Sequence, residues 1–254
     1  MKNILSCRPG SYGRYHDTAY AHLQKIGVKH VEIGAPSSDA IEKTLNELNS
    51  FGLTATSLHG SYNVADEHAA KSFKSQVDAA VKLEAKHIFL SVKAGDLDKS
   101  IVYGRLREIG DTAAASGVTL ILETHPDLIT NGDVALQTMR GVNHPNVRVN
   151  FDTANIYYYN QGIDGITEMK KVIDYIEGVH LKETNGGYHA WYFPAFSEGI
   201  VNFKEVFRLM NAREFYGPFT IEIEGIEGEN LTLEQTQERI AKSVEHLRRS
   251  GCVE

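Results

Sequence analysis

The sequence repeats one order of local structure: an amphipathic helix, then a glycine, then a short apolar run. Three segments show this order most clearly, and they read LQKIGVKHVEIG, LNSFGLTATSLHG and AAASGVTLILETH. Gly27, Gly52 and Gly117 stand where each helix is expected to end in a left-handed cap. The apolar runs that follow are short, as in strands that are buried on both faces. This order favours an α/β fold that is built around a parallel sheet.

Followed along the whole chain, the pattern predicts eight strands that alternate with eight helices, in repeats of about 30 residues, as is typical of a (β/α)8 TIM barrel. An open doubly wound sheet is the alternative, but no G-x-G-x-x-G motif follows the first strand. No Pro/Ser-rich linker divides the chain, so we expect a single domain over residues 1–254. The strands are predicted at residues 4–7, 30–34, 54–59, 87–92, 119–123, 148–152, 178–182 and 220–224. The helices are predicted at residues 19–26, 40–50, 67–83, 102–115, 134–141, 166–175, 203–210 and 233–249.

Composition narrows the functional classes. The formal net charge of the 254 residues is −7, which provides no electrostatic attraction to nucleic acid or to an anionic membrane. No apolar run approaches the roughly 18–20 residues that span a bilayer, and the first residues lack a signal-peptide core. We therefore expect a cytoplasmic protein. Cys7 and Cys252 are the two cysteines, and the predicted barrel places them at opposite ends, so we expect no disulfide between them.

Polar residues close the predicted strands at their C-terminal ends, where a TIM barrel has its active site. Four successive strands and two earlier ones carry them: Glu123, Asp152, His180 and either Glu222 or Glu224, preceded by Glu32 and His59. The steps from Glu123 to Asp152 and from Asp152 to His180 are 29 and 28 residues, about one βα unit. Because side chains alternate along a strand, Lys182 is expected on the same face as His180, roughly 6–7 Å nearer the mouth.

This set predicts one divalent metal ion. A single acid at a strand end is more often a cap or a salt-bridge partner than a ligand, but four such residues on four successive strands favour a shared site. Neighbouring buried carboxylates are costly unless a cation neutralises them. Two glutamates, one aspartate and one histidine suit Mn²⁺, Mg²⁺, Co²⁺ or Zn²⁺, and this ligand set does not select among them. At this point Glu222 and Glu224 compete for the last ligand position.

The segments LETH, NFDTAN, GVHLKE, FSEGIVNF and FTIEIEG resemble the xylose-isomerase-like superfamily of sugar and sugar-phosphate isomerases and epimerases. The motifs cover the second half of the chain, and topology covers the first half. The resemblance implies four metal ligands, and it favours Glu222 because the first acid of the family's last strand is the ligand: Glu123, Asp152, His180 and Glu222. The chain departs from the family pattern at Ser197, where the family has glycine, at Asn202, where it has aspartate, and at Asn155, where similar epimerases have a substrate-binding histidine.

The resemblance implies an isomerase or epimerase that moves a proton through an enediolate. Glu123 and Glu222 are then the acid and base, and Lys182 donates a hydrogen bond to a substrate oxygen. We expect a carbohydrate substrate, bound by His59, His125, Asn155 and Trp191. We expect no nucleic acid or membrane partner, and the sequence leaves homo-oligomer formation open.

Three other functions remain as alternatives at this stage. A lyase on the same scaffold, such as a dehydratase or a 3-keto-glycoside eliminase, uses the same enolate chemistry but expels a leaving group. An endonuclease-IV-like phosphodiesterase shares the barrel, but it needs more histidine ligands and a basic groove for DNA. A non-enzymatic sugar-binding protein is disfavoured by the expected acid and base pair.

Overall fold

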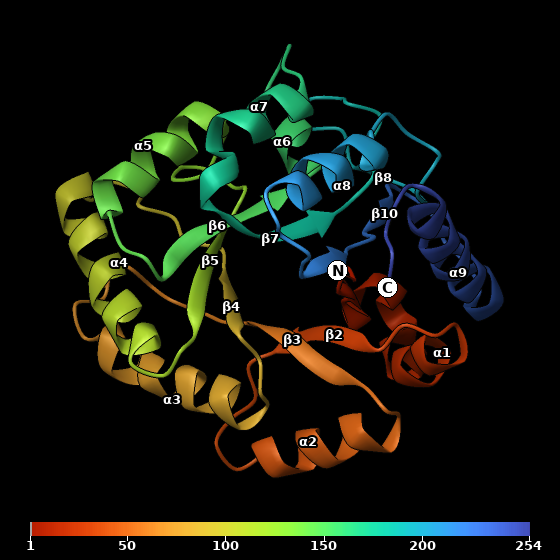
Figure 1. The fold of residues 1–254 in the computed structure, drawn as a ribbon, viewed down its shortest axis with the longest axis horizontal. Helices are drawn as coiled ribbons and strands as arrows, with labels where there is room; N and C mark the ends of the chain where they lie inside the picture. Colours follow the sequence, from red (N-terminus) through yellow and green to blue (C-terminus); the bar gives the residue numbers. More distant parts are fainter. Residues whose placement is uncertain (1) are drawn as a thin grey trace.

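The structure is a computed structural model that describes residues 2–254, and its strands close into a barrel (Figure 1). Every neighbouring pair of barrel strands is parallel, and the last strand pairs with the first. This confirms the predicted (β/α)8 TIM barrel. In order around the barrel, the strands are β1 (Leu5–Cys7), β2 (His30–Gly34), β3 (Thr54–His59), β4 (His87–Leu90), β5 (Thr119–Glu123), β6 (Val147–Asp152), β7 (Ile176–Leu181) and β9 (Phe219–Ile221).

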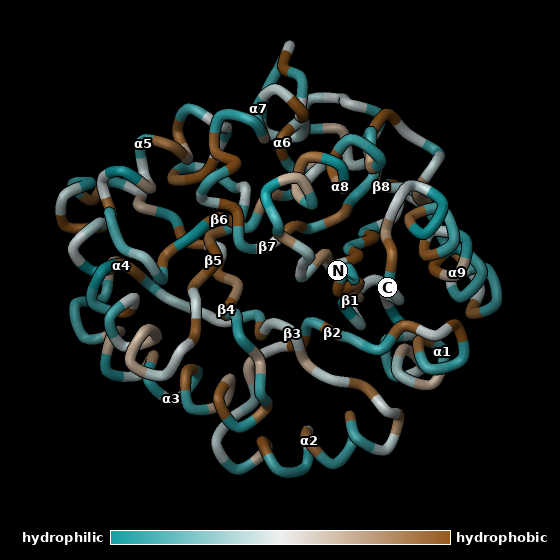
Figure 2. The backbone as a smooth tube through the Cα atoms, viewed as in Figure 1, coloured by the Kyte–Doolittle hydropathy of each residue, from teal (hydrophilic) through white to brown (hydrophobic). Residues whose placement is uncertain are grey.

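Helices surround the barrel, and the outward turns of α2, α4 and α9 are mostly hydrophilic, whereas apolar segments lie along strands such as β5 and β6 (Figure 2). Gly27, Gly52 and Gly117 have φ values of 76°, 64° and 67°, which confirms the predicted left-handed caps. The helices between barrel strands, with the last one following β9, are α1 (Ala19–Lys25), α2 (Ile41–Ser50), α3 (Ala69–Lys82), α4 (Lys99–Ala114), α5 (Gly132–Val142), α7 (Gly165–Val172), α8 (Phe203–Ala212) and α9 (Leu233–Arg249).

Several helices begin earlier than the apolar periodicity predicts, because capping residues set their starts. Asp98 accepts a hydrogen bond from the backbone of Ser100, so α4 begins three residues before the predicted position 102. Asn131 and Asp164 cap α5 and α7 in the same way. The prediction of a single helix over 166–175 is wrong at its end, since α7 stops at Val172 and a 3-10 turn follows.

The strands predicted at 178–182 and 220–224 both end sooner, at Leu181 and Ile221. Thr153 explains the first difference. Its hydroxyl accepts from the backbone N–H of Lys182 at 2.9 Å and donates to the carbonyl of Lys182 at 2.7 Å. A side chain therefore takes the place of the next ladder partner. Lys182 therefore lies just beyond β7, and Glu222 lies just beyond β9, both at the barrel mouth.

Three elements at the mouth were not predicted: a 3-10 segment (Pro9–Thr18), α6 (Asn155–Tyr158) and a two-stranded antiparallel pair of β8 (Tyr192–Phe193) and β10 (Gly225–Ile226). The first contains Gly13 in a non-helical conformation, so it has no regular periodicity. The strands of the pair have two residues each and come from distant parts of the chain. Short elements of this kind leave no local pattern in a sequence.

The loop before α8 contains the two positions at which the chain departs from the family pattern, Ser197 and Asn202. Ser197 takes the glycine position and has a φ of 86°, in the left-handed region. Asn202 replaces aspartate and still caps α8 by accepting from the backbone of Glu205 at 3.1 Å. The buried carboxylate of Glu183 accepts from the backbone N–H groups of Ser197 at 3.2 Å and Val201 at 3.0 Å. These contacts fix the loop against Glu183, which follows β7.

The two chain ends meet at the bottom of the barrel, opposite the mouth. The N and C marks lie close together (Figure 1), and the backbone of Val253 donates to the side chain of Asn3, just before β1, at 3.0 Å. Cys252 is therefore near the start of β1, and Cys7 is at its end; both are buried and free. Within residues 2–254, we find no helix whose length and apolar character would let it cross a bilayer.

Candidate active site

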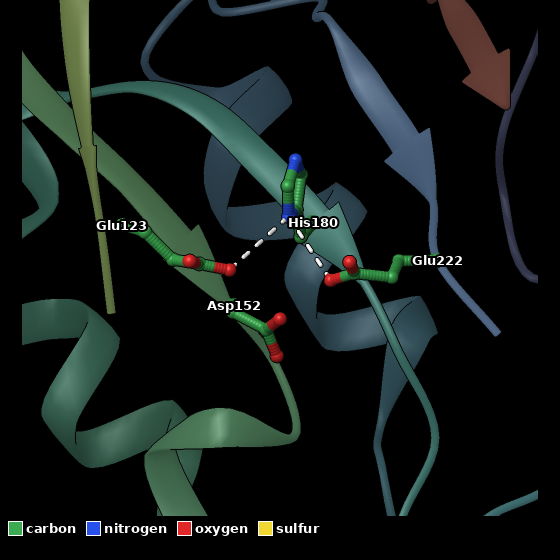
Figure 3. A group of neighbouring side chains, drawn as sticks. All are labelled: Glu123, Asp152, His180 and Glu222. Carbon is green, nitrogen blue, oxygen red and sulfur yellow. Dashed lines mark ion pairs between the residues drawn. The ribbon is translucent and has the colours of Figure 1, made fainter. Parts of the chain in front are cut away.

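Four side chains converge at the mouth of the barrel: Glu123, Asp152, His180 and Glu222 (Figure 3). They come from the ends of β5, β6, β7 and β9, and all four are buried. Each offers a ligand atom that lies within 4.8 Å of those of the other three. The register explains this convergence, because Asp152 pairs with His180 across β6 and β7, so the two side chains reach the same height.

Asp152 has one oxygen that is fully bonded and one that is open. Its Oδ1 accepts from the backbone N–H groups of Ala154 and Asn155, both at 2.8 Å. These donors lie at the start of α6, where a carboxylate is favoured. Its Oδ2 has no hydrogen-bond partner among the described residues and is buried. The aspartate is therefore held rigidly with a free lone pair toward the centre of the cluster.

His180 likewise has one ring nitrogen with a hydrogen-bond partner and one without. Its Nε2 lies 3.0 Å from Oε1 of Glu32, a buried carboxylate that also accepts from Ser57 at 2.6 Å. Burial acts to lower the pKa of His180, but Glu32 and Glu222 outweigh burial and raise it well above the usual value, so the ring is protonated on both nitrogens. A bound cation would replace the proton on Nδ1, and Glu32 would hold the proton on Nε2. Nδ1 has no hydrogen-bond partner in residues 2–254, and it faces Glu222 at 3.2 Å and Glu123 at 3.7 Å (Figure 3). Glu32 thus orients the histidine for ligation.

Glu222 also has one paired oxygen and one open oxygen, and its paired oxygen contacts Arg8, which follows β1. The guanidinium of Arg8 pairs with Oε1 of Glu222 and lies 3.5 Å from Glu32. Oε2 of Glu222 is buried and lacks a hydrogen-bond partner in the part of the chain that the structure describes. Glu224, the competing acid, is outside the cluster: it pairs with Lys182, and 34% of its side chain is exposed.

The electrostatics of the cluster suit a divalent cation. Burial, followed by the nearby charges of Glu222 and Glu123, raises the pKa of Asp152, although Lys182 opposes this. Burial acts against ionisation of Glu222 too, but Lys182 and His180 outweigh it and hold its pKa well below the usual range. A cation among these carboxylates would remove the cost of ionising Asp152. Three open buried ligand atoms beside Glu123 are the donor set that such an ion requires.

Lys182 is fully buried above the cluster. Its Nζ lies 3.6 Å from Glu222 and 3.9 Å from Asp152, and it also pairs with Glu224. Burial acts to lower its pKa, but these three carboxylates outweigh burial and raise it, so the amine is protonated. The side-chain oxygen of Asn155 accepts from Nζ at 3.3 Å. The lysine is thus a fixed cationic donor at the site.

A pocket of about 330 Å³ opens above the cluster. His59, His125 and Trp191 line it without joining the four-residue cluster, and Asn155 bridges Lys182 and Glu123 at its floor. His59 lies 3.2 Å from Arg8, and the ring of His125 is 4.7 Å from that of Tyr159. The sequence-predicted site residues therefore line this cavity, except for Asp152 and His180, which belong to the four-residue cluster but do not line the cavity.

The sequence did not predict the role of Arg8, the contact between Glu32 and His180, or part of the aromatic lining of the pocket. Arg8 was not singled out, although its place directly after the first strand was a signal. Glu32 was noted at a strand end, but its contact with His180 depends on closure of the barrel. The aromatic wall was only partly foreseen. The pocket is also lined by Phe89, Tyr158, Tyr159 and Phe193.

Glu32→Gln should weaken metal binding while preserving the fold. The amide has the shape of the carboxylate but lacks the charge that favours donation from Nε2 of His180. We expect the dissociation constant for Mn²⁺ to rise about 10–100-fold, the usual effect of a partner behind a metal ligand. Calorimetric titration measures it. Ser57→Ala removes a different contact of Glu32 and should have a smaller effect, whereas unchanged affinity in Glu32→Gln would show that it does not orient the histidine.

Trp191→Ala should weaken sugar binding much more than it weakens folding. Trp191 is 43% exposed, and its ring lies 5.2 Å from that of Phe193. We expect about a 10-fold loss of affinity from the removed aromatic surface and a change of less than about 1 kcal/mol in the free energy of unfolding. Tyr188→Ala is the control, since Tyr188 is similarly exposed in the same loop but does not line the pocket. An equal loss of thermal stability and affinity would indicate a packing role for Trp191.

The sequence profile of the xylose isomerase-like TIM barrel family matches residues 20–250. No curated protein matches the sequence significantly. Solved structures with the same fold include a xylose isomerase domain protein from Planctomyces limnophilus, with 19% identity, a TM-score of 0.76 and coverage of 98% of this chain and 96% of that one. A D-allulose 3-epimerase from Methylomonas sp., in complex with D-allulose, has 18% identity, a TM-score of 0.77 and 98% coverage of both chains. A probable 3-DHS dehydratase from Bacillus anthracis has 17% identity and a TM-score of 0.73, and the match covers 98% of this chain and 99% of the dehydratase.

Proposed function

Since this chain belongs to the xylose isomerase-like TIM barrel family, we propose that it is a divalent-metal-dependent isomerase or epimerase of a sugar or sugar derivative. One observation carries the proposal: three buried ligand atoms without partners, on Asp152, His180 and Glu222, face one point beside Glu123. That point lies at the floor of the pocket, next to a protonated lysine.

Each residue of the site has a role in proton transfer between neighbouring carbons. Glu123 and Glu222 flank His180, at 3.7 Å and 3.2 Å from its Nδ1, and are the two groups that take up and return the proton. The low pKa of Glu222 keeps it ionised as a base. Lys182 donates to the oxygen on which negative charge develops. The bound cation would supply polarisation of neighbouring substrate oxygens, which lowers the energy of an enediolate.

A sugar substrate agrees with the pocket and with the solved relatives. The aromatic side chains of Trp191 and Tyr158 line the pocket with apolar surface that suits a sugar ring, and His59 and His125 line it with nitrogen atoms that suit hydroxyl groups. One relative is an epimerase with a ketose bound. Asn155 stands where similar epimerases have a substrate-binding histidine, so we propose a substrate other than that of the ketose 3-epimerases.

A lyase on the same scaffold is the second candidate, because the site has a donor suited to a leaving group. Lys182 is protonated and buried at the pocket floor, so it can donate a proton to a departing oxygen. One solved relative is a probable dehydratase. The endonuclease-like alternative has less support, because the cluster of four residues is the only one of its kind in residues 2–254.

The experiment is a screen of sugars and oxidised sugars with Mn²⁺-loaded protein, performed in H₂O and in D₂O. An isomerase or epimerase that acts through an enediolate leaves product mass unchanged in H₂O and incorporates one deuterium in D₂O. A dehydratase lowers the mass by one water. Turnover that continues after complete removal of the metal would count against the proposed chemistry. So would an isomerised product that contains no deuterium after reaction in D₂O, under conditions where water reaches the site.

A further inference from the structure

A second pocket, of about 430 Å³, opens beside the first. The two share Trp191 and Glu224, which stand between them as a common wall. Each pocket is within the size range of small-molecule sites, about 300–1,000 Å³. The two cavities therefore lie on either side of one shared wall.

The second pocket is formed by the 3-10 segment after β1 and by the loop that leads into α9. Arg14 joins these two parts: its guanidinium donates to the carbonyl of Leu231 at 2.9 Å and to the hydroxyl of Tyr15 at 2.8 Å. Arg239 of α9 pairs with Glu229, with both side chains largely buried. The cavity thus has planar charged groups that are already held in place, and an aromatic ring beside them.

Glycines keep this cavity open. Gly10 and Gly13 line it, and a Cβ built at either position would meet no atom within 4 Å. Gly13 has a φ of 55°, a conformation that residues with side chains rarely adopt.

Trp191 and Glu224, the two residues shared by the pockets, are both held by contacts with other parts of the site. The carbonyl of Trp191 accepts from the backbone of Glu227 at 3.0 Å, beside the pairing of β8 with β10. Glu224 pairs with Lys182 on the side of the metal cluster. An aromatic ring next to fixed carboxylate and guanidinium groups suits the two kinds of surface on a sugar, the C–H face and the hydroxyl edge.

We propose that the second pocket is a subsite for a second sugar unit, so that the substrate is a glycoside or disaccharide rather than a free monosaccharide. This inference rests on the proposed function, which places the reacting sugar in the first pocket. The second unit lies on the far side of Trp191, against Arg14, Glu229 and Arg239.

Trp191 is the only tryptophan in the sequence, so its fluorescence reports directly on the shared wall. Mg²⁺-loaded protein is titrated with aldoses, ketoses, the disaccharides built from them and their nitrophenyl glycosides. At least one disaccharide should bind about 10-fold or more tightly than either of its monosaccharides. Saturation-transfer NMR should show that both of its rings contact the protein.

Asn230→Phe fills the second pocket. Asn230 is exposed, lines that pocket, and its side chain has no hydrogen bond among the described residues, so the fold should tolerate the change. In this variant, the dissociation constant of the disaccharide should lie within about twofold of that of the monosaccharide. Saturation transfer to the second ring should disappear. Asn49→Phe, at an exposed asparagine of α2, is the matched control and should change neither result.

The outcomes separate the two proposals. Monosaccharides that bind as well as their disaccharides, or an advantage that persists in Asn230→Phe, would overturn the subsite and leave the proposed function standing. A gain for nitrophenyl glycosides alone would overturn the assignment of a second sugar. Absence of binding by every sugar would contradict the proposed function, and the subsite with it.

Discussion

His180→Ala should abolish metal retention. In the structure, Nδ1 of His180 faces Glu123 and Glu222, and the ring is held by Glu32 from behind. Alanine removes the single nitrogen ligand and leaves three carboxylates around a wider space. We expect affinity for Mn²⁺ to fall by at least about 100-fold, more than the effect of losing a partner behind a ligand, and activity to fall with it. Metal analysis after gel filtration, with calorimetric titration, measures the change.

A matched control separates this effect from general damage. His22→Ala removes another buried histidine, one whose ring contacts Tyr12 at 2.8 Å in the outer layer of the barrel. It should lower thermal stability but retain stoichiometric metal. If His180→Ala bound Mn²⁺ as tightly as the unaltered protein, the cluster would not be the metal site.

Lys182→Met should preserve the metal and lose activity. Methionine retains most of the apolar stem over the ring of Phe193, where Nζ lies 4.3 Å from the centroid, but it removes the charged donor. We expect turnover to fall about 10²-fold or more, the usual contribution of one proton-transfer or hydrogen-bonding group. Without metal, the Lys182→Met variant should also be less stable to unfolding than the metal-free unaltered protein, because Asp152 and Glu222 remain buried without their lysine. Bound metal should restore part of that stability.

Kinetics and thermal melting, each with and without Mn²⁺, test this variant. Lys171→Met is the control: Lys171 also pairs with two carboxylates, Asp133 and Glu168, but on the outer helices. It should retain full turnover. If turnover and substrate affinity were unchanged in Lys182→Met, the lysine would act only as a structural counter-ion of the cluster.

The order of the elements could be predicted from sequence because each βα unit carries its own local signals. A glycine with positive φ ends the helix, and a short apolar run follows, as at Gly27 and Gly117. The four clustered residues could be placed together for a related reason. Each closes one strand, and parallel strands of a barrel end on the same face.

Contacts between distant segments could not be predicted in this way. Arg8 meets Glu222, and Glu32 meets His180, only because β1 closes against β9 and the barrel interior is shared. The choice of Glu222 over Glu224 needed the family resemblance, since both have the same parity in the sequence. In the structure, Lys182 holds Glu224 at the edge of the pocket.

The most direct test is a crystal structure of the protein with Mn²⁺, with the metal located by anomalous scattering. The account predicts one strong peak per chain, within about 2.0–2.6 Å of ligand atoms from the four clustered residues. It also predicts that Nδ1 of His180, not Nε2, faces the ion, with Glu32 behind the ring. Absence of a peak in the cluster at saturating Mn²⁺, or a peak only elsewhere on the chain, would contradict it.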